Sequence, residues 1–282
     1  MNLRTTLQNL FVLSLIVFSL GYPYIVLAQD TIVTISDAGL RTAIETKLGK
    51  APGADITEAE MATLDTLEAR SLKIQSLTGL STAINLQELR LSGNNISDIS
   101  ELASLTQLQV LHISDNQISD ISALAGLTQL ESLSLNMNPI SDLSFLSDLT
   151  NLKFLYLEKC SLSDISPLMN NIGLNQGDKL ALQGNRLNYT SLYSDIPALQ
   201  DRGVEVVFTE RTLTFKSSTT DLVPQILSGT LEGTVYITAR DEKGFGFEGI
   251  PVTFTVTTGE GTLSTTDTVS YTHLTLPTKR IV

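Results

Sequence analysis

The sequence predicts a solenoid of stacked repeats, with a parallel β-sheet along a concave face, turns or 3₁₀ segments along the convex face and a helical cap at the N-terminal end. Three observations predict it. The chain repeats every 22 residues between Leu86 and Leu174, the repeat becomes irregular on both sides, and the composition shifts from Thr212 onward to Thr, Val and Gly. A fixed period of this length is typical of solenoids, and atypical terminal units are typical of their caps. The later shift predicts a separate all-β module.

Residues 1–28 are expected to be a signal peptide that is removed during export. Met1–Asn9 is basic without any acid, Leu10–Leu20 is almost wholly apolar, and the small residue Ala28 ends a suitable cleavage site. The alternative is a transmembrane anchor, which the short apolar core and its interruption by Gly21 and Pro23 disfavour. We therefore expect a secreted or cell-surface protein.

Charge and cysteine content restrict the partners and the source of stability. The 282-residue chain carries a formal net charge of −12, and loss of the signal peptide, which holds one arginine and no acid, makes it more acidic. Acidic exported chains are poor ligands for nucleic acid and for anionic membranes. The single cysteine, Cys160, excludes an internal disulfide framework. We therefore expect stability to come from the stacked core.

The regular units begin at Leu86, Leu108, Leu130 and Leu152. When that first leucine is counted as position 0, apolar residues recur at positions 3, 5, 10, 13, 16 and 19. Positions 2 to 6 alternate, which predicts a short strand with positions 3 and 5 inward and positions 2, 4 and 6 outward. The S-D-I-S segment and the residues after it are too short for a full helix, so turns and 3₁₀ segments are expected there. Stacking then buries the apolar edge that no single unit can bury.

Two polar positions of the repeat are interpreted as structural. Position 8 holds Asn94, Asn116 and Asn138, which are predicted to form a ladder that satisfies buried backbone groups of adjacent repeats. The ladder is interrupted at Cys160, interpreted as a small buried thiol and not as a nucleophile, because no histidine lies at a matching position. The recurrent aspartates are interpreted as turn-forming residues and not as calcium ligands. They are Asp98, Asp120, Asp142 and Asp164.

Irregular units are predicted at both ends of the solenoid, which spans residues 64–209. The upstream unit begins at Leu64 and has Leu72 at the asparagine position. Downstream, the segment KLALQGNRL restores the strand and the ladder residue Asn185 after a three-residue slip. Val204–Phe208 then supplies a last strand that covers the sheet edge.

Residues 29–63 are predicted to form the helical cap. One helix opens at Ser36 or Asp37, and its buried face carries Leu40, Ile44 and Leu48. A second helix begins at Thr57, where Glu60 completes a capping-box pattern.

Function is expected on the concave face, where positions 2, 4 and 6 point outward. Nothing in the repeat requires an aromatic residue there, so Phe154 with Tyr156 is the best candidate anchor, since interface hot spots favour aromatic residues and Arg. The alternative is that both rings merely shield the sheet near the imperfect last repeat. The candidate partner-binding residues are Phe154, Tyr156, Arg90, His112, Val110, Glu88, Glu158 and Lys179.

No catalytic or metal-binding constellation accompanies these residues. His112 is interpreted as an ordinary exposed side chain, because no second ligand stands at metal spacing, and Arg90 as a partner of Glu68 or Glu88. The sequence contains no G-x-S-x-G, H-E-x-x-H or P-loop motif. We therefore expect a monomeric binding protein and not an enzyme, with no cofactor, no metal and no small-molecule substrate. Its expected ligand is a protein or peptide.

The pattern L-x-x-L-x-L-x-x-N-x-I-x-D-I-S is that of leucine-rich repeats. With the 22-residue period, the ISDIS and LTxL phrases and the expected helical cap, Thr31–Phe208 resembles the internalin-type leucine-rich repeat proteins of bacteria. The resemblance implies a secreted or surface-exposed, adhesin-like protein that binds through its concave face.

The module at residues 212–268 resembles a bacterial immunoglobulin-like domain of the invasin and intimin kind. The stretch GTVYITARDEKGFGFEGIPVTFTVTTGEGTL carries this resemblance, although the module is shorter than a full sandwich of about 100 residues. Internalins likewise follow their repeats with such a module. We expect a partial all-β sandwich that serves as a spacer or stalk.

The final residues 269–282, VSYTHLTLPTKRIV, are unlike the rest of the chain. They resemble a phrase that recurs as translated sequencing-adapter read-through at the ends of unrelated assembled genes, so we expect a non-native tail. The alternative is a genuine last strand, since THLTL alternates correctly. Two other functions stay open: an accessory binding region of a larger surface enzyme whose catalytic domain is missing from this chain, and an envelope scaffold.

Overall fold

The structure is a computed structural model that describes residues 30–210 and, outside that range, the backbone of five short strands. β1 (Leu13–Ile16) and β2 (Tyr24–Leu27) pair antiparallel. β10 (Thr214–Ser218), β11 (Tyr236–Arg240) and β12 (Leu274–Thr275) form an antiparallel sheet in that order. The remainder of the expected signal peptide, immunoglobulin-like module and C-terminal tail lies outside the described residues.

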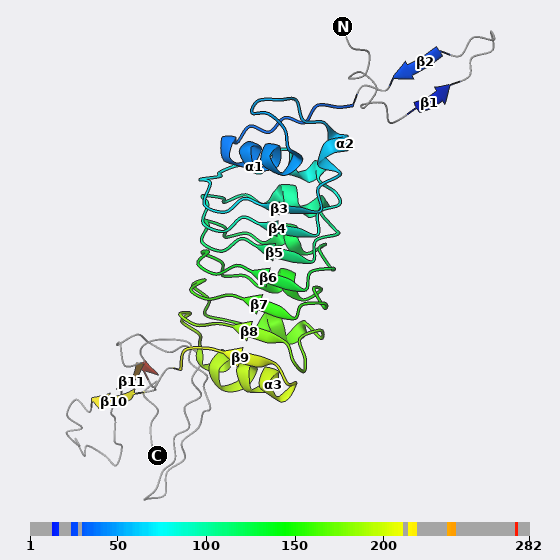
Figure 1. Cartoon of the computed structure of the whole chain (residues 1–282). Coiled ribbons are helices and arrows are strands. Elements are labelled where there is room, and N and C mark those ends of the chain that lie inside the picture. Colours follow the sequence, from blue (N-terminus) through cyan, green and yellow to red (C-terminus); the bar gives the residue numbers. More distant parts are fainter. Residues whose placement is uncertain are drawn as a thin grey trace, which may run out of the picture.

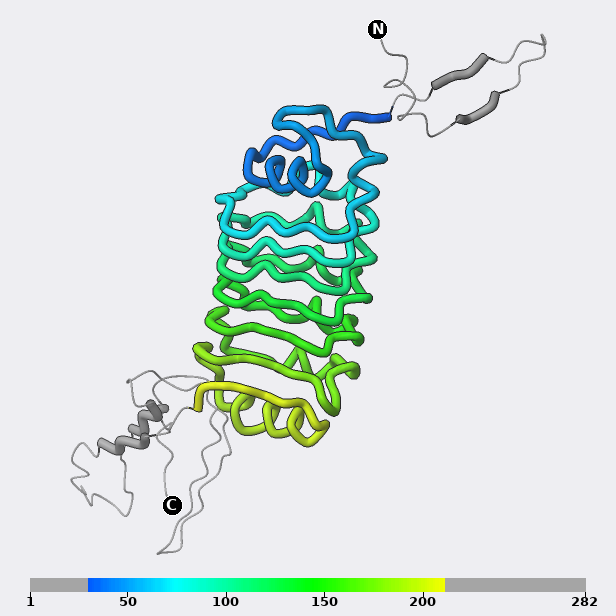
Figure 2. The backbone as a smooth tube through the Cα atoms, in the orientation of Figure 1, coloured from blue at the N-terminus to red at the C-terminus, as the bar shows by residue number. Residues whose placement is uncertain are grey.

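A seven-stranded parallel sheet runs the length of the solenoid, with strands in chain order (Figure 1). The strands are β3 (Thr66–Glu68), β4 (Glu88–Arg90), β5 (Val110–His112), β6 (Ser132–Ser134), β7 (Phe154–Tyr156), β8 (Lys179–Ala181) and β9 (Glu205–Val207). Figure 2 shows one turn of chain per strand, so units adjacent in sequence are also adjacent in space. The predicted parallel sheet and the last strand before Phe208 are confirmed.

Each strand is shorter than the predicted run of positions 2 to 6 and covers only positions 2 to 4. The backbone leaves the ladder because position 7 adopts left-handed φ angles, as at Asp115 (55°) and Met137 (55°). Two more hydrogen bonds to the next unit follow the strand, from Leu91 N–H to His112 C=O at 2.7 Å and from Gly93 N–H to Ser114 C=O at 2.9 Å. The tight turn after position 6 thus limits the length of every strand.

The opposite side of the stack consists of short 3₁₀ segments, as predicted. These are η1 (Leu80–Thr82), η2 (Ser100–Ser104), η3 (Ser122–Leu124), η4 (Ser144–Leu146) and η5 (Ser166–Asn170). Before each of the last four, an aspartate side chain accepts a local backbone N–H, as from Ser100 to Asp98 Oδ1 at 2.8 Å. The repeated aspartates are therefore turn-forming residues.

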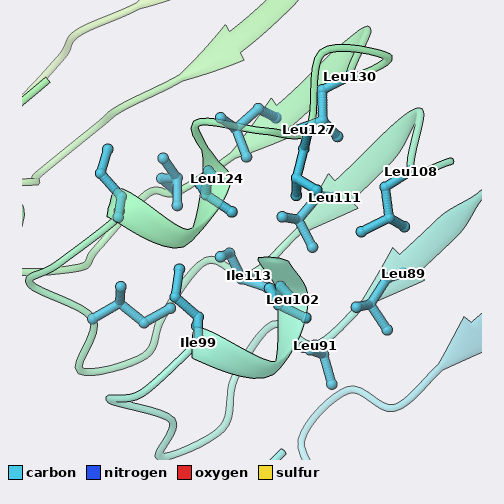
Figure 3. Close-up of a cluster of buried hydrophobic side chains, with 14 of the residues drawn as sticks. Leu89, Leu91, Ile99, Leu102, Leu108, Leu111, Ile113, Leu124, Leu127 and Leu130 are labelled. Carbon is cyan, nitrogen blue, oxygen red and sulfur yellow. The ribbon is translucent and has the colours of Figure 1, made fainter. Parts of the chain in front are cut away.

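The core between sheet and 3₁₀ segments is a continuous apolar column. Figure 3 shows leucines and isoleucines of both sides converging, for example Leu111 from β5 and Leu124 from η3. Both are completely buried, as are Leu89, Leu133 and Leu155 at position 3 of the neighbouring units. Burying a leucine side chain contributes about 1.5–3 kcal/mol, so each added repeat stabilises the one before it.

The asparagine ladder at position 8 is present. Asn94 Oδ1 accepts from Leu72 N–H (2.9 Å) and Ile74 N–H (3.0 Å), while its Nδ2 donates to Ala69 C=O (2.8 Å) and Leu91 C=O (2.7 Å). Asn116, Asn138 and Asn185 repeat this pattern against the preceding unit. Leu72 needs no amide of its own because no repeat precedes it, and its side chain is exposed.

Cys160 replaces one ladder asparagine and performs half of its role. Its thiol donates to Leu135 C=O (3.3 Å), as the Nδ2 group of an asparagine would. It offers no amide oxygen to Ile140 N–H, which bonds to Asn138 C=O instead (2.8 Å). Burial raises the pKa of the Cys160 thiol to about 11. The interpretation as a small buried thiol is confirmed.

The helix α1 (Ala38–Leu48) lies across the first turn of the solenoid (Figure 1). Of the two predicted N-caps, the structure uses Asp37, whose Oδ1 accepts from Gly39 N–H (2.9 Å) and Leu40 N–H (3.0 Å). Asp37 Oδ2 also accepts from Gln75 N–H (2.8 Å), which ties the helix to the first repeat. These four backbone donors, the fourth being Ser76 N–H, outweigh partial burial and lower the pKa of Asp37.

The second helix, α2 (Glu58–Met61), is a single turn. The capping box predicted for it is present, with Thr57 Oγ1 accepting from Glu60 N–H (3.3 Å) and Glu60 Oε2 accepting from Thr57 N–H (2.9 Å). Met61 is fully buried and anchors this turn in the core.

The C-terminal end of the solenoid contains helical structure that the repeat pattern does not predict. A π-helical turn, η6 (Ser191–Asp195), continues into α3 (Ile196–Asp201) before β9. The inner side of this segment is buried and consists of Leu192, Ile196 and Leu199. Asp195 lies beside them with a buried Oδ2 atom that has no hydrogen-bond partner, and burial raises its pKa.

Within the described part of the chain, no helix has the length and apolar content needed to cross a membrane.

Candidate binding surface on the sheet

The solvent-facing side of the sheet, called the sheet face below, consists of the side chains at positions 2, 4 and 6. Parallel pairing places equivalent positions of neighbouring units side by side, about 4.8 Å apart. Position 2 therefore forms the row Thr66, Glu88, Val110, Ser132, Phe154, Lys179 and Glu205. Position 4 forms the row Glu68, Arg90, His112, Ser134, Tyr156, Ala181 and Val207. All eight candidate partner-binding residues lie on this face.

At the N-terminal end of the sheet face, five side chains form a charged cluster: Glu68, Arg70, Glu88, Arg90 and His112. Arg90 Nε contacts Glu88 Oε1 directly and lies 3.9 Å from Glu68 Oε2. Arg70 Nε lies 2.8 Å from Glu68 Oε1. Arg90 thus pairs with both glutamates that the sequence offered as alternatives, and the cluster compensates its own charge.

His112 extends this cluster toward the middle of the sheet and is half-buried, so the prediction of an exposed side chain was wrong. Its Nδ1 atom lies 3.1 Å from Arg90 Nη1, and its Nε2 atom lies 3.3 Å from Ser132 Oγ. A guanidinium can only donate, so Nδ1 must be the acceptor and the imidazole must be neutral, with its proton on Nε2. Partial burial and the positive charges of Arg90 and Arg70 lower the pKa of His112.

The middle of the sheet face is small and polar. Ser114 Oγ and Ser134 Oγ are 2.6 Å apart across β5 and β6. Val110, a predicted contact residue, is half-buried beside Glu88 and Ser132. Among the described residues, no cluster of three or more metal-ligating side chains is present.

At the C-terminal end, four side chains form an aromatic patch: Phe154, Tyr156, Ala181 and Val207. Phe154 is 38% exposed and Val207 is 42% exposed, while Tyr156 is half-buried. Ala181 was predicted to point outward but is buried, because its methyl group stands between the larger Tyr156 and Val207 in the same row. The predicted candidates did not include Val207, although its strand was predicted and the alternation would have placed it outward.

The two remaining candidates, Glu158 and Lys179, border this patch. Lys179 Nζ pairs with Glu205 Oε2 at 3.1 Å, so its charge is already compensated. Glu158 Oε2 accepts from Asn136 Nδ2 at 2.7 Å, and the Asn136 amide oxygen accepts from Glu158 N–H at 2.7 Å. The side-chain amide of Gln183 is oriented with its nitrogen toward Glu158 Oε1 and Val207 C=O, and it donates to Glu158 Oε1 at 3.2 Å.

Comparison with known proteins supports the repeat assignment. Residues 84–127 and 128–170 match the family model described as leucine-rich repeats (2 copies). Comparison with curated proteins gives no significant match.

Comparison with solved structures finds several similar proteins. An internalin, InlF, from Listeria monocytogenes is 33% identical with a TM-score of 0.56, and the alignment covers 65% of this chain and 59% of that one. Internalin C2 of the same organism is 28% identical with a TM-score of 0.39, covering 64% and 98% of the two chains. The functional domain of InlJ, also from L. monocytogenes, is 18% identical with a TM-score of 0.47, covering 58% and 42%. The chain therefore carries leucine-rich repeats in a solenoid similar to that of the internalin InlF, of which it spans 59%.

Proposed function

We propose that this is an exported, adhesin-like protein that binds a protein or peptide on its sheet face, with the aromatic patch as the anchor. The observation that carries the proposal is the exposure of Phe154, in the strand of Tyr156, and of Val207, two strands further along the row of Tyr156. Both stand at positions where the core needs no apolar side chain. Elsewhere in these two rows the side chains are mostly polar or charged. Apolar and aromatic side chains gathered at one exposed place favour an interaction site.

The polar groups of the solenoid suit binding better than catalysis. Cys160 is buried, and its thiol, with a pKa of about 11, stays protonated at neutral pH. Both ring nitrogens of His112 lie within hydrogen-bond distance of Arg90 or Ser132. Neither group is placed to act as a nucleophile or base, which supports a non-enzymatic role. The similarity to the internalin InlF also supports a role at or outside the cell surface.

The test uses the full chain, immobilised and panned against a phage-displayed library of random peptides. Peptides that are enriched are then measured by biolayer interferometry on the wild type and on the double variant Phe154→Ala plus Tyr156→Ala. We expect the double variant to weaken binding by at least about tenfold, because aromatic hot spots contribute 2 kcal/mol or more.

The matched control is Tyr193→Ala, which removes an exposed tyrosine of η6, away from the sheet. Its ring lies beside that of Tyr189, with 4.7 Å between the ring centroids. Unchanged binding in this control and an unchanged melting temperature in the double variant locate the effect on the sheet face. Equal affinity of wild type and double variant for every enriched peptide would overturn the proposal.

A further inference from the structure

Four glutamates lie at the outward positions of the sheet face, and one of them lacks the ion pair that the other three form with described residues. Glu68, Glu88 and Glu205 each pair with an arginine or lysine. Glu158 forms no ion pair with any described residue, although Lys159 is its neighbour in sequence. Its uncompensated charge stands in a row of the sheet next to the aromatic patch.

The carboxylate of Glu158 is held in place. Asn136 from the unit of β6 donates to one oxygen (2.7 Å) and Gln183 from the unit of β8 donates to the other (3.2 Å). Both donors are neutral amides, so they fix the position of the carboxylate without cancelling its charge. A half-buried anion fixed in advance loses little freedom when a cation binds to it.

Tyr156 lies two residues before Glu158 on the same face, about 6.6 Å away along the strand. Lysine and arginine side chains combine a charged end with an apolar stem, and their cations are attracted to aromatic ring faces. An arginine or lysine crossing Tyr156 would reach Glu158. An apolar neighbour in the same ligand would meet Phe154 and Val207.

Building on the proposed function, we propose that the occupant of the sheet face is a peptide segment with an arginine or lysine next to a large apolar residue. Glu158 and Tyr156 would receive the basic side chain, and Phe154 with Val207 the apolar one. The formal net charge of −12 favours such a basic segment over an acidic one. The charged cluster at the other end of the sheet offers no comparable group, because its carboxylates are paired.

The test compares peptides that the full chain selects from the random library with those selected by Glu158→Gln. Glutamine has the same shape and still accepts from Asn136. Its amide nitrogen faces Gln183, whose side-chain amide can turn its oxygen to accept from it. The main change in the variant is therefore the loss of the charge. We expect the wild type to enrich arginine or lysine beside an aromatic or aliphatic residue, and the variant to lose the basic preference. The affinity of a wild-type-selected peptide is expected to fall about tenfold in Glu158→Gln.

The matched control is Glu131→Gln. It removes the charge of an exposed carboxylate whose Oε2 atom lies 2.9 Å from Lys153 Nζ, just before β7. Unchanged selection by this control excludes a general effect of net charge. Selection of peptides without basic residues that still depend on Phe154 and Tyr156 would overturn the inference and leave the proposed function standing. If no selected peptide depended on those two rings, both would fail.

Discussion

The two ends of the sheet face share one backbone and one register but differ in what their side chains leave available. In the charged cluster, Arg90 contacts Glu88, Glu68 and His112, so its charge and donors are used within the protein. In the aromatic patch, Phe154 and Val207 stay exposed, and Glu158 at its border accepts from a neutral amide. The proposed binding site therefore differs from the charged cluster in its exposed apolar side chains and in a carboxylate that pairs with no arginine or lysine among the described residues.

This difference is confined to the surface. Position 3 carries a completely buried leucine under both ends, at Leu111 beneath the charged cluster and at Leu155 beneath the aromatic patch. The repeat thus fixes the interior and leaves the outward positions free to vary.

The largest expected effect tests that shared interior. Leu111→Ala and Leu155→Ala should each lower the free energy of unfolding by about 2–5 kcal/mol, because each leaves a cavity in a closely packed column. Urea denaturation followed by circular dichroism measures both. Losses that differ by more than about 2 kcal/mol between the two variants would show that the interiors under the two ends differ as well.

The ladder offers a smaller contrast, between the neighbouring units of β6 and β7. Asn138→Ala would leave Ile118 N–H, Ile113 C=O and Leu135 C=O without their side-chain partner, at a cost of about 1–3 kcal/mol. Cys160→Ala would remove only a weak thiol donor, which contacts Leu135 C=O and Glu158 C=O, and should cost less than half as much. The same urea experiment compares them, and an equal loss in both variants would contradict the view that Cys160 performs only part of the ladder role.

The repeating part of the fold could be predicted from the sequence because each unit meets the same constraints. The strands, the 3₁₀ segments, the asparagine ladder and the capping box at Thr57 all follow from residue types at fixed positions. The helical segment from Ser191 to Asp201 was missed because it departs from the 22-residue period. The spacing of Leu192, Ile196 and Leu199 contained a signal for it.

The binding surface could be predicted only in part. Alternation places Phe154 and Tyr156 outward, but it also placed Ala181 outward, where two larger neighbours cover a methyl group. Whether a charged residue is compensated depends on contacts across strands. Sequence spacing could suggest the partners of Arg90. It could not show that Glu158 is held by two amides and pairs with no cation in the part of the chain that the structure describes.

The smallest expected effect concerns the charged cluster and acid. The folded state lowers the pKa of His112 below its ordinary value of 6.5, so folding favours the neutral ring. The resulting stability is fully present above pH 6.5 and is lost as the pH falls through the lowered pKa, because a protonated ring would face the Arg90 guanidinium. The ring is only partly buried, so we expect a loss of about 0.5 kcal/mol between about pH 7.5 and pH 5. The variant His112→Gln should remove this loss of stability. The control variant His273→Gln, which replaces the other histidine of the chain, should leave the loss unchanged. An NMR titration of His112 that gave a pKa above 6.5 would contradict the neutral assignment and, with it, the conclusion that this end of the sheet satisfies its own polar groups.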